Sequence, residues 1–339
     1  MYMRSQISII SIILLVFTSC INKENNYREQ FFPREESLHG DILCSDLCVN
    51  LPFDMCCIND YIALLSLKDG KLLHFYDKQS GRFVGSYVSH GNGANEYFQI
   101  SDLSFDYSRR LLSFVEVNKE RLIGIEVDDS LKMHKVYEQS LKGKAKVFRT
   151  AFPLNDTINL IESQAIKGSS WLQTIDSAGF VVSDYSSTLD NSLEDAVLTS
   201  QTHSVVSPSG THYARATLFG GILQIFDVDD GKIKCRHIGR HIRPIGNVVG
   251  LSFENTPETI LCYCDLFATN KYLYGVMLNT VQETNSSLVV WDWEGNPIAK
   301  WNSDKLLQHI CIDPEDESIL YATTVKEGSL NLERFVIPL

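Results

Sequence analysis

The stretch Leu72-Leu73-His74-Phe75-Tyr76-Asp77, with a turn that ends at Gly81, decides the fold of this chain. The same pattern returns 150 residues later as Ile222-Leu223-Gln224-Ile225-Phe226-Asp227, with a turn that ends at Gly231. Weaker copies of the pattern end near three further aspartates, Asp128, Asp176 and Asp292. A unit of about fifty residues that repeats paired strands is typical of a β-propeller.

Further strand pairs fill the sequence between these anchors. Residues 61–67 have the pattern of a strand and turn at Lys68-Asp69-Gly70, where glycine can adopt the positive φ that a tight hairpin needs. Similar pairs join residues 102–105 to 111–117, 205–206 to 211–218 and 310–313 to 319–324. Helical periodicity is essentially absent beyond the N-terminal segment. The sequence therefore predicts an all-β fold, a six-bladed β-propeller of four-stranded antiparallel blades over residues 40–339.

Two features of the spacing predict how the ring is completed. The interval between the last two anchors is longer than the others, and we expect the extra residues between Ile242 and Asn270. After Asp292, only one hairpin and a strand at residues 330–337 fit before the chain ends, so the sixth blade lacks a strand. We expect residues 41–50 to supply it, because an N-terminal closing strand pairs an open edge and ties the chain ends together.

The N-terminal segment has the pattern of an export signal. Residues 1–19 carry one charge, Arg4, then an apolar run from Ile7 to Phe17 and small residues directly before Cys20. We expect a lipoprotein signal peptide over residues 1–19 and lipidation of Cys20, with a plain secretory signal as the alternative. Residues 20–39 are expected to form a flexible tether. These features predict a lipid-anchored protein of the cell envelope, at the outer membrane, with the periplasmic and surface faces both open.

Charge and cysteine content limit the partners and the chemistry. The formal net charge is −12 and no basic patch with interleaved aromatic residues is found, which argues against a nucleic-acid partner. Of the nine cysteines, one is assigned to the lipid, and the spacing of the other eight matches no disulfide framework. We expect most of them to be buried as small apolar residues, with one or two disulfides as the alternative.

One loop carries a resemblance to a known family. The segment Gly91-Asn92-Gly93-Ala94-Asn95-Glu96-Tyr97 resembles the G-x-G-x-x-E-aromatic loop of TolB-like six-bladed propeller lipoproteins of the Bacteroidota. The likeness covers most of the mature chain through the repeats, this loop and Cys20, although these proteins usually have proline in place of Ala94. The resemblance implies a six-bladed fold and an envelope lipoprotein, and it brings no enzymatic activity with it.

The candidate binding residues lie in two segments. Two glycines of the first segment could be read as a phosphate cradle, but Glu96 stands where a dinucleotide fingerprint needs its third glycine, so a crossing between blades explains the loop better. The second segment is the one locally basic stretch of an acidic chain. The candidates are Gly91, Gly93, Glu96 and Tyr97 in the first segment, and Arg240, His241 and Arg243 in the second.

No metal or cofactor is expected from local motifs. The acidic turn Asp227–Gly231 lacks the glutamate that an EF-hand loop has at its twelfth position. Neither Cys56-Cys57 nor Cys262-Tyr263-Cys264 is a C-x-x-C pair, and His237 and His241 lie on a strand end and loop rather than on a helix. Three tryptophans, Trp291, Trp293 and Trp301, could form a sugar-stacking platform, but packing between twisted blades is the favoured interpretation.

These observations lead to one function hypothesis and one rival. The first is a non-enzymatic binding or interaction module that presents its channel mouth to an envelope protein or a glycan. The rival is a metal-dependent hydrolase or lyase with its site in the propeller channel. For the rival, Glu96, Asp102 and His203 are the ligands to consider, because they lie near blade boundaries.

Overall fold

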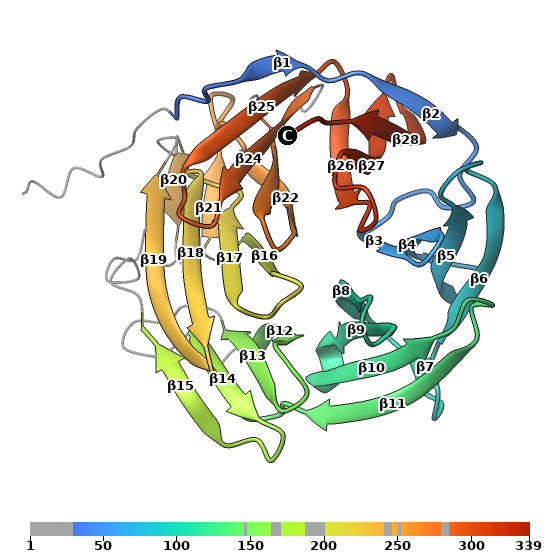
Figure 1. Cartoon of the computed structure of the whole chain (residues 1–339), viewed down its shortest axis with the longest axis vertical. Helices are drawn as coiled ribbons and strands as arrows, with labels where there is room; N and C mark the ends of the chain where they lie inside the picture. The colour runs from blue at the N-terminus through green and yellow to red at the C-terminus, as the bar shows by residue number, and fades with distance from the viewer. Residues whose placement is uncertain are drawn as a thin grey trace, which may run out of the picture.

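The computed structural model describes residues 30–145, 148–163, 171–186, 201–240, 246–249, 252–278 and 285–339. Six sheets stand around a central channel like the blades of a propeller (Figure 1). The predicted six-bladed β-propeller of mainly four-stranded antiparallel blades is confirmed. The only helical segment among these residues is the single turn of 3₁₀-helix η1 (Val117–Lys119).

The strands of each blade follow one another from the channel outward. Blade 1 contains β3 (Asp54–Ile58), β4 (Tyr61–Lys68), β5 (Lys71–Asp77), β6 (Phe83–His90) and β7 (Glu96–Tyr97). Blade 2 contains β8 (Ile100–Asp106), β9 (Leu111–Glu116), β10 (Arg121–Val127) and β11 (Met133–Ser140). Blade 3 contains β12 (Phe148–Pro153), β13 (Ile158–Ser163), β14 (Leu172–Asp176) and β15 (Val181–Tyr185).

The remaining blades have the same order. Blade 4 contains β16 (Thr202–Val206), β17 (His212–Thr217), β18 (Ile222–Asp229) and β19 (Lys232–Arg240). Blade 5 contains β22 (Tyr263–Ala268), β23 (Tyr272–Met277), β24 (Ser286–Asp292), β25 (Pro297–Ser303) and β1 (Glu35–Ser37). Blade 6 contains β26 (Leu306–Ile312), β27 (Ile319–Lys326), β28 (Ser329–Val336) and β2 (Gly40–Cys44). The extra residues before blade 5 include the hairpin of β20 (Gly246–Val249) and β21 (Ser252–Asn255), within the region where extra length was expected.

Burial follows the position of a strand within its blade. The second strand of blade 2, β9, is buried along its whole length, because neighbouring blades cover both of its faces. The outermost strand of the same blade, β11, alternates between exposed and partly buried residues, as a strand with one face in solvent does. The core therefore lies between the blades rather than in one central layer.

The interface between blades 4 and 5 illustrates this core. Ala214 and Ile225 of blade 4 belong to the same buried cluster as Tyr263 and Trp291 of blade 5. Trp293 and Trp301 are also almost fully buried, and the Trp293 indole donates a hydrogen bond to the carbonyl of Thr269 at 3.2 Å. The three tryptophans consequently fill space between blades and form no exposed sugar platform.

The N-terminal part of the described chain closes the ring. Strand β2 pairs antiparallel with β28, with Gly40 opposite Phe335, so the predicted closure of the sixth blade is in place. Figure 1 shows β1 and β2 passing along the outer edges of blades 5 and 6. Strand closure leaves the outer edge of blade 6 paired instead of open.

The expected start of the folded domain at residue 40 is too late. Strand β1 adds to blade 5 by pairing parallel with β25, and Phe32 and Leu38 on either side of it are buried. The Phe32 ring packs edge-on against Trp291, with a centroid distance of 5.8 Å. Residues 30–39 are thus part of the fold, and the tether prediction is wrong for them.

The N-terminal export features lie outside the described residues. This holds for the predicted signal peptide over residues 1–19 and for the lipidated Cys20. Among the residues from 30 onward that the structure describes, we find no helix with the length and apolar character of a membrane span.

Candidate functional site

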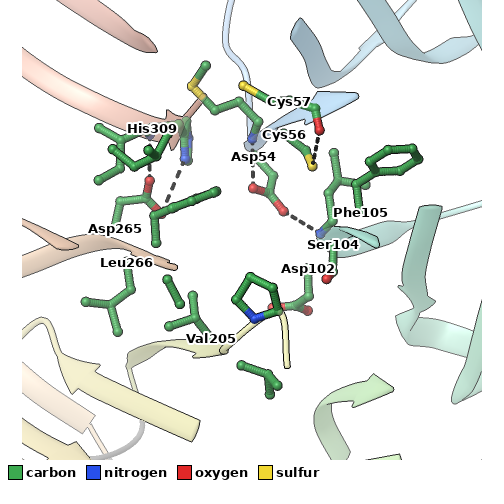
Figure 2. Close-up of a pocket in the computed structure, with 18 of the residues that line it drawn as sticks. Asp54, Cys56, Cys57, Asp102, Ser104, Phe105, Val205, Asp265, Leu266 and His309 are labelled. Atoms are coloured by element: carbon green, nitrogen blue, oxygen red, sulfur yellow. Dashed lines mark hydrogen bonds and ion pairs between the residues drawn. The ribbon is translucent and has the colours of Figure 1, made fainter. Parts of the chain in front are cut away.

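A cavity of about 530 Å³ occupies the central channel. Its walls come from the innermost strands of the blades and from the segments that follow those strands. Figure 2 shows side chains from several blades converging on this space. Five ionisable side chains near the starts of innermost strands line it, and we call them the channel cluster: Asp54, Asp102, His203, Asp265 and His309.

Asp54, the first residue of β3, links blades 1 and 2. Its Oδ1 accepts a hydrogen bond from the amide of Met55 at 2.7 Å, and its Oδ2 accepts one from the amide of Leu103 in blade 2 at 2.8 Å. Burial and the nearby Asp265 raise the pKa of Asp54 to about 7, although His309 and the Leu103 amide oppose this rise. A carboxyl group that titrates near neutrality can act as either a donor or an acceptor toward a ligand.

Asp265 of blade 5 lies at similar distances from two histidines. Its Oδ2 accepts a hydrogen bond from the amide of Ile310 at 2.8 Å. Its Oδ1 lies 3.9 Å from Nδ1 of His309 and 4.0 Å from Nδ1 of His203. The Asp265 carboxylate therefore lies between a histidine of blade 4 and a histidine of blade 6 at the wall of the channel.

The two histidines of the channel cluster have different proton affinities. Burial lowers the pKa of His309, but Asp265 and Asp54 outweigh burial, and the net pKa is raised. The other ring nitrogen of His309, Nε2, lies 3.2 Å from the carbonyl of Pro52, which fits a proton on that nitrogen. Desolvation dominates for His203 and lowers its pKa despite Asp265, so the neutral form is favoured there.

Asp102 sits on a strained turn of blade 2. Its φ is +57°, in the left-handed region that non-glycine residues seldom adopt, and the pairing of β8 with β9 shifts register at this point. The hydroxyl of Ser101 donates to Asp102 at 2.5 Å, while burial raises the pKa of the carboxyl. The irregular backbone turns this carboxyl toward the cavity (Figure 2).

A buried ion-pair network supports the wall at blades 3 and 4. Glu162 is fully buried, with Nε of Arg149 at 3.4 Å and a guanidinium nitrogen of Arg215 at 3.7 Å. The Tyr213 hydroxyl donates to the Glu162 carboxylate at 2.6 Å. Burial raises the pKa of Glu162, but Arg149 and Arg215 outweigh it and the net pKa is lowered. Glu162 therefore stays ionised and fixes the strands next to His203.

Apolar side chains complete the cavity. Met55, Phe105, Val205, Leu266 and Ile310 line it together with the channel cluster. The volume is within the usual range for small-molecule sites, and such sites combine apolar walls with a few fixed polar groups. The arrangement suits a ligand with an apolar face and several hydrogen-bond donors.

A resident metal ion does not match the donors present. Across the ranges that the structure describes, no three His, Cys, Asp or Glu side chains are placed to hold one metal ion. We therefore derive no chemistry through a metal.

Only some of the candidate residues that the sequence analysis named lie at the channel cavity. Asp102 and His203 line the channel cavity, whereas Glu96 does not. The Glu96 carboxylate accepts a hydrogen bond from the amide of Gly93 at 2.9 Å and so closes its own loop, which continues into β7 and the next blade. Tyr97 is buried and packs edge-on against Phe114 at 5.0 Å. The Gly91–Tyr97 loop is thus built as a crossing between blades.

The basic segment is only partly covered by the structure. Arg240 ends β19 on the outer side of blade 4, opposite Ile222, and does not line the channel cavity. His241 and Arg243 lie outside the described residues. A binding role for these three residues stays a prediction.

Three members of the channel cluster were missed by sequence reasoning: Asp54, Asp265 and His309. Each lies within the first four residues of an innermost strand, as do Asp102 and His203. The only signal in the sequence is a polar residue near the start of an otherwise apolar strand, repeated from blade to blade. That signal is visible once the blades are aligned with one another.

Comparisons with known proteins agree with the fold. A family model described as TolB-like 6-blade propeller-like matches residues 30–315. A search of curated proteins gives no match to the chain.

Solved structures of low sequence identity share the architecture. A putative exported protein of Bacteroides fragilis is 15% identical, with a TM-score of 0.57 over 90% of this chain and 99% of that one. A member of the DUF4221 family from Bacteroides vulgatus is 10% identical, with a TM-score of 0.57 over 88% and 98%. A gluconolactonase from Xanthomonas campestris is 11% identical, with a TM-score of 0.51 over 89% and 90%. At these identities the likeness concerns the fold alone.

Proposed function

Since the chain belongs to the TolB-like family of six-bladed propellers, we propose that it is an exported, lipid-anchored protein that binds a glycan in its channel cavity without transforming it. The observation that carries this proposal is the convergence of the channel cluster, drawn from five blades, on one cavity of about 530 Å³. A rigid ring holds these groups in a fixed arrangement, which lowers the entropic cost of ordering a binding site.

The chemistry of the cavity favours a sugar that carries an amino group. Three carboxyl groups and two histidines line the cavity, and His203 favours its neutral form. In the described part of the chain, Asp54 forms no ion pair with a lysine or an arginine, and its hydrogen bonds come from backbone amides. An ammonium group and sugar hydroxyls would donate to these carboxyl oxygens, and the apolar face of a pyranose would pack against Phe105 or Leu266.

Export and anchoring are the second part of the proposal. The segment before Cys20 has the features of a lipoprotein signal, and a structural neighbour from Bacteroides fragilis is described as a putative exported protein. Nine residues lie between Cys20 and Gln30, so a lipid on Cys20 would keep the ring close to the membrane. Incorporation of labelled palmitate that is lost in Cys20→Ala would support the anchor. Unlabelled wild-type protein in the soluble fraction would contradict it.

A titration experiment with defined sugars tests the binding proposal. Calorimetry with glucosamine oligomers, N-acetylglucosamine oligomers and maltose oligomers measures the preference for an amino group. We expect the glucosamine oligomers to bind best, and Asp265→Asn to weaken that binding about 10-fold or more, because a charged hydrogen-bond partner is lost. The matched control is Asp129→Asn, which changes an exposed aspartate outside the cavity. Equal binding by wild type and Asp265→Asn would contradict the proposal.

One observation favours a second candidate, an acid–base enzyme without a metal. Asp54 has a pKa of about 7, and a carboxyl with this property can serve as a general acid. Mass analysis of each sugar after incubation separates the two functions. Recovery of the unchanged sugar supports binding alone, and a cleaved or rearranged product that is absent with Asp54→Asn supports the enzyme.

A further inference from the structure

Two cysteine sulfur atoms meet at the seam where the chain closes into a ring. Sγ of Cys57 lies 2.9 Å from Sγ of Cys311, although the two residues are 254 positions apart. Cys57 belongs to β3, the first strand of blade 1, and Cys311 belongs to β26, the first strand of blade 6. The distance is inside the ordinary contact distance of two sulfur atoms, and a small rotation about either Cα–Cβ bond can bring them to bonding distance.

The surroundings fix both sulfur atoms in place. Both side chains are almost fully buried, in one apolar cluster with Met55 and Tyr321. The Tyr107 hydroxyl donates to the carbonyl of Cys57 at 2.7 Å and holds the backbone of β3 from blade 2. The neighbouring Cys56 directs its own thiol to the carbonyl of Cys57 at 3.3 Å. Cys57 is therefore the residue of this adjacent pair that faces Cys311.

We infer that Cys57 and Cys311 form a disulfide in the mature protein and that this bond covalently closes the propeller ring. The inference goes beyond ligand binding, but it depends on the export proposed above, because disulfides form and persist outside the reducing cytosol. The bond would add a covalent closure on the channel side to the hydrogen-bonded closure by β2 and β28 on the outer side.

The chemistry needs an oxidant of the envelope, a protein that carries a reactive disulfide. The thiolate of one cysteine attacks a sulfur atom of the donor disulfide, forms a mixed disulfide and releases the donor's other sulfur as a thiolate. The thiolate of the second cysteine then attacks the mixed disulfide, which forms the Cys57–Cys311 bond and frees the donor. Two electrons and two protons pass to the donor, which leaves as a dithiol.

The order of events follows from burial. Burial raises the pKa of Cys311 well above its usual value, so the thiolate is scarce once the ring is complete. Exchange with the donor is consequently expected while blade 6 is docking against blade 1, when both sulfur atoms are still accessible. After docking, the same burial protects the bond from reductants.

The bond would also fix part of the channel cluster. Asp54 lies three residues before Cys57 on β3, and His309 lies two residues before Cys311 on β26. Cys57 lines the channel cavity near Asp54 (Figure 2). A covalent link between these strands would hold the carboxyl of blade 1 and the imidazole of blade 6 at a constant separation.

Peptide mapping of the wild-type protein tests the inference without any variant. The full chain, expressed with its own leader, is isolated from the envelope after rapid alkylation of free thiols under denaturing, non-reducing conditions. We expect a linked pair of peptides that contains Cys57 and Cys311, and alkylation of the other six of the eight cysteines that the structure describes. Alkylation of Cys57 and Cys311, or a different pairing of either one, would overturn the inference.

A stability measurement provides the second readout. Wild type that is unfolded and refolded in reductant should have a thermal midpoint roughly 5–10 °C below that of the oxidised protein, because the bond closes a very long loop. The same treatment should have the same effect on Cys262→Ala, a buried control cysteine, and no effect on the double variant Cys57→Ala/Cys311→Ala. A reductant effect of equal size in the double variant would contradict the inference. If the double variant does not fold, the peptide mapping of wild type alone tests the inference.

Cell fractionation separates a failed disulfide from a failed export. Protein found in the envelope with free Cys57 and Cys311 thiols overturns the disulfide and leaves the proposed export and glycan binding intact. Protein found only in the cytosol contradicts the export and, with it, the disulfide.

Discussion

Asp265 on β22 and His309 on β26 face each other across the boundary between blades 5 and 6, with 3.9 Å between Oδ1 and Nδ1. The residue after His309 reinforces this relationship, because the amide of Ile310 donates to the other carboxylate oxygen of Asp265. One carboxylate thus both orients a channel histidine and anchors the strand that carries it.

The first prediction concerns this pair. Asp265→Asn should lower the pKa of His309, because the variant removes the charge that outweighs desolvation. In wild type, the raised pKa stabilises the fold at low pH, and this contribution is lost as pH rises through the raised value. NMR titration of the His309 ring measures the shift, with Asp129→Asn as the control. A His309 pKa that is unchanged in Asp265→Asn would refute the assigned role.

The second prediction concerns Asp54 and pH. Its pKa in the fold is about 7, above the usual 3.8, so the folded protein binds more protons than the unfolded chain between these values. The contribution of the Asp54 carboxyl to the unfolding free energy is therefore complete below about pH 4, and it is lost as the pH rises through about 7. Between pH 5 and pH 8, wild type should lose roughly 1–3 kcal/mol more unfolding free energy than Asp54→Asn, after allowance for partial exposure of the carboxyl.

Urea denaturation at each pH measures this difference. The control is again Asp129→Asn, whose exposed side chain should leave the pH profile of wild type unchanged. Parallel pH profiles for wild type and Asp54→Asn would show that Asp54 is already ionised well below neutrality.

The third prediction concerns the buried network at blade 3. Glu162→Gln removes the charge that Arg149 and Arg215 share, and both guanidinium groups remain in place. Loss of one partner of a buried ion pair costs about 3 kcal/mol or more of unfolding free energy. Urea denaturation measures the loss, and Glu126→Gln on the exposed side of β10 is the control. A loss equal to that of the control would mean that the network adds no stability.

The fourth prediction concerns the N-terminal edge of blade 5. Phe32 is 8% exposed and packs on Trp291, whereas the adjacent Phe31 is 82% exposed. Phe32→Ala should lower the unfolding free energy by about 2–4 kcal/mol, and Phe31→Ala should have little effect. Equal effects of the two substitutions on the thermal midpoint would mean that the chain before β1 does not dock as described.

The architecture was predictable because its evidence is local. Each hairpin brings together residues that are close in sequence, and the copies at Asp77 and Asp227 reveal the period directly. The start of the fold was placed too late because β1 has the sequence Glu-Glu-Ser and pairs through its backbone, so it carries no apolar alternation.

The site was predictable only in part because its members are far apart in sequence. About fifty residues separate Asp54 from Asp102, and similar or longer intervals separate the other members. Asp102 and His203 were predicted from their positions near blade boundaries. The same argument also predicted Glu96 at the cavity, and that prediction was wrong. The Glu96 carboxylate is used within its own loop by the Gly93 amide, a contact that spacing alone does not reveal.

The central claim is that the channel cavity holds a glycan, and a crystal structure with bound sugar tests it most directly. The protein would be crystallised with the sugar oligomer that binds most tightly in calorimetry. We predict a sugar ring inside the cavity, with its amino or hydroxyl groups within hydrogen-bond distance of Asp54 and Asp265. Sugar bound at the Gly91–Tyr97 loop or on the outer strands, with an empty cavity, would contradict the claim.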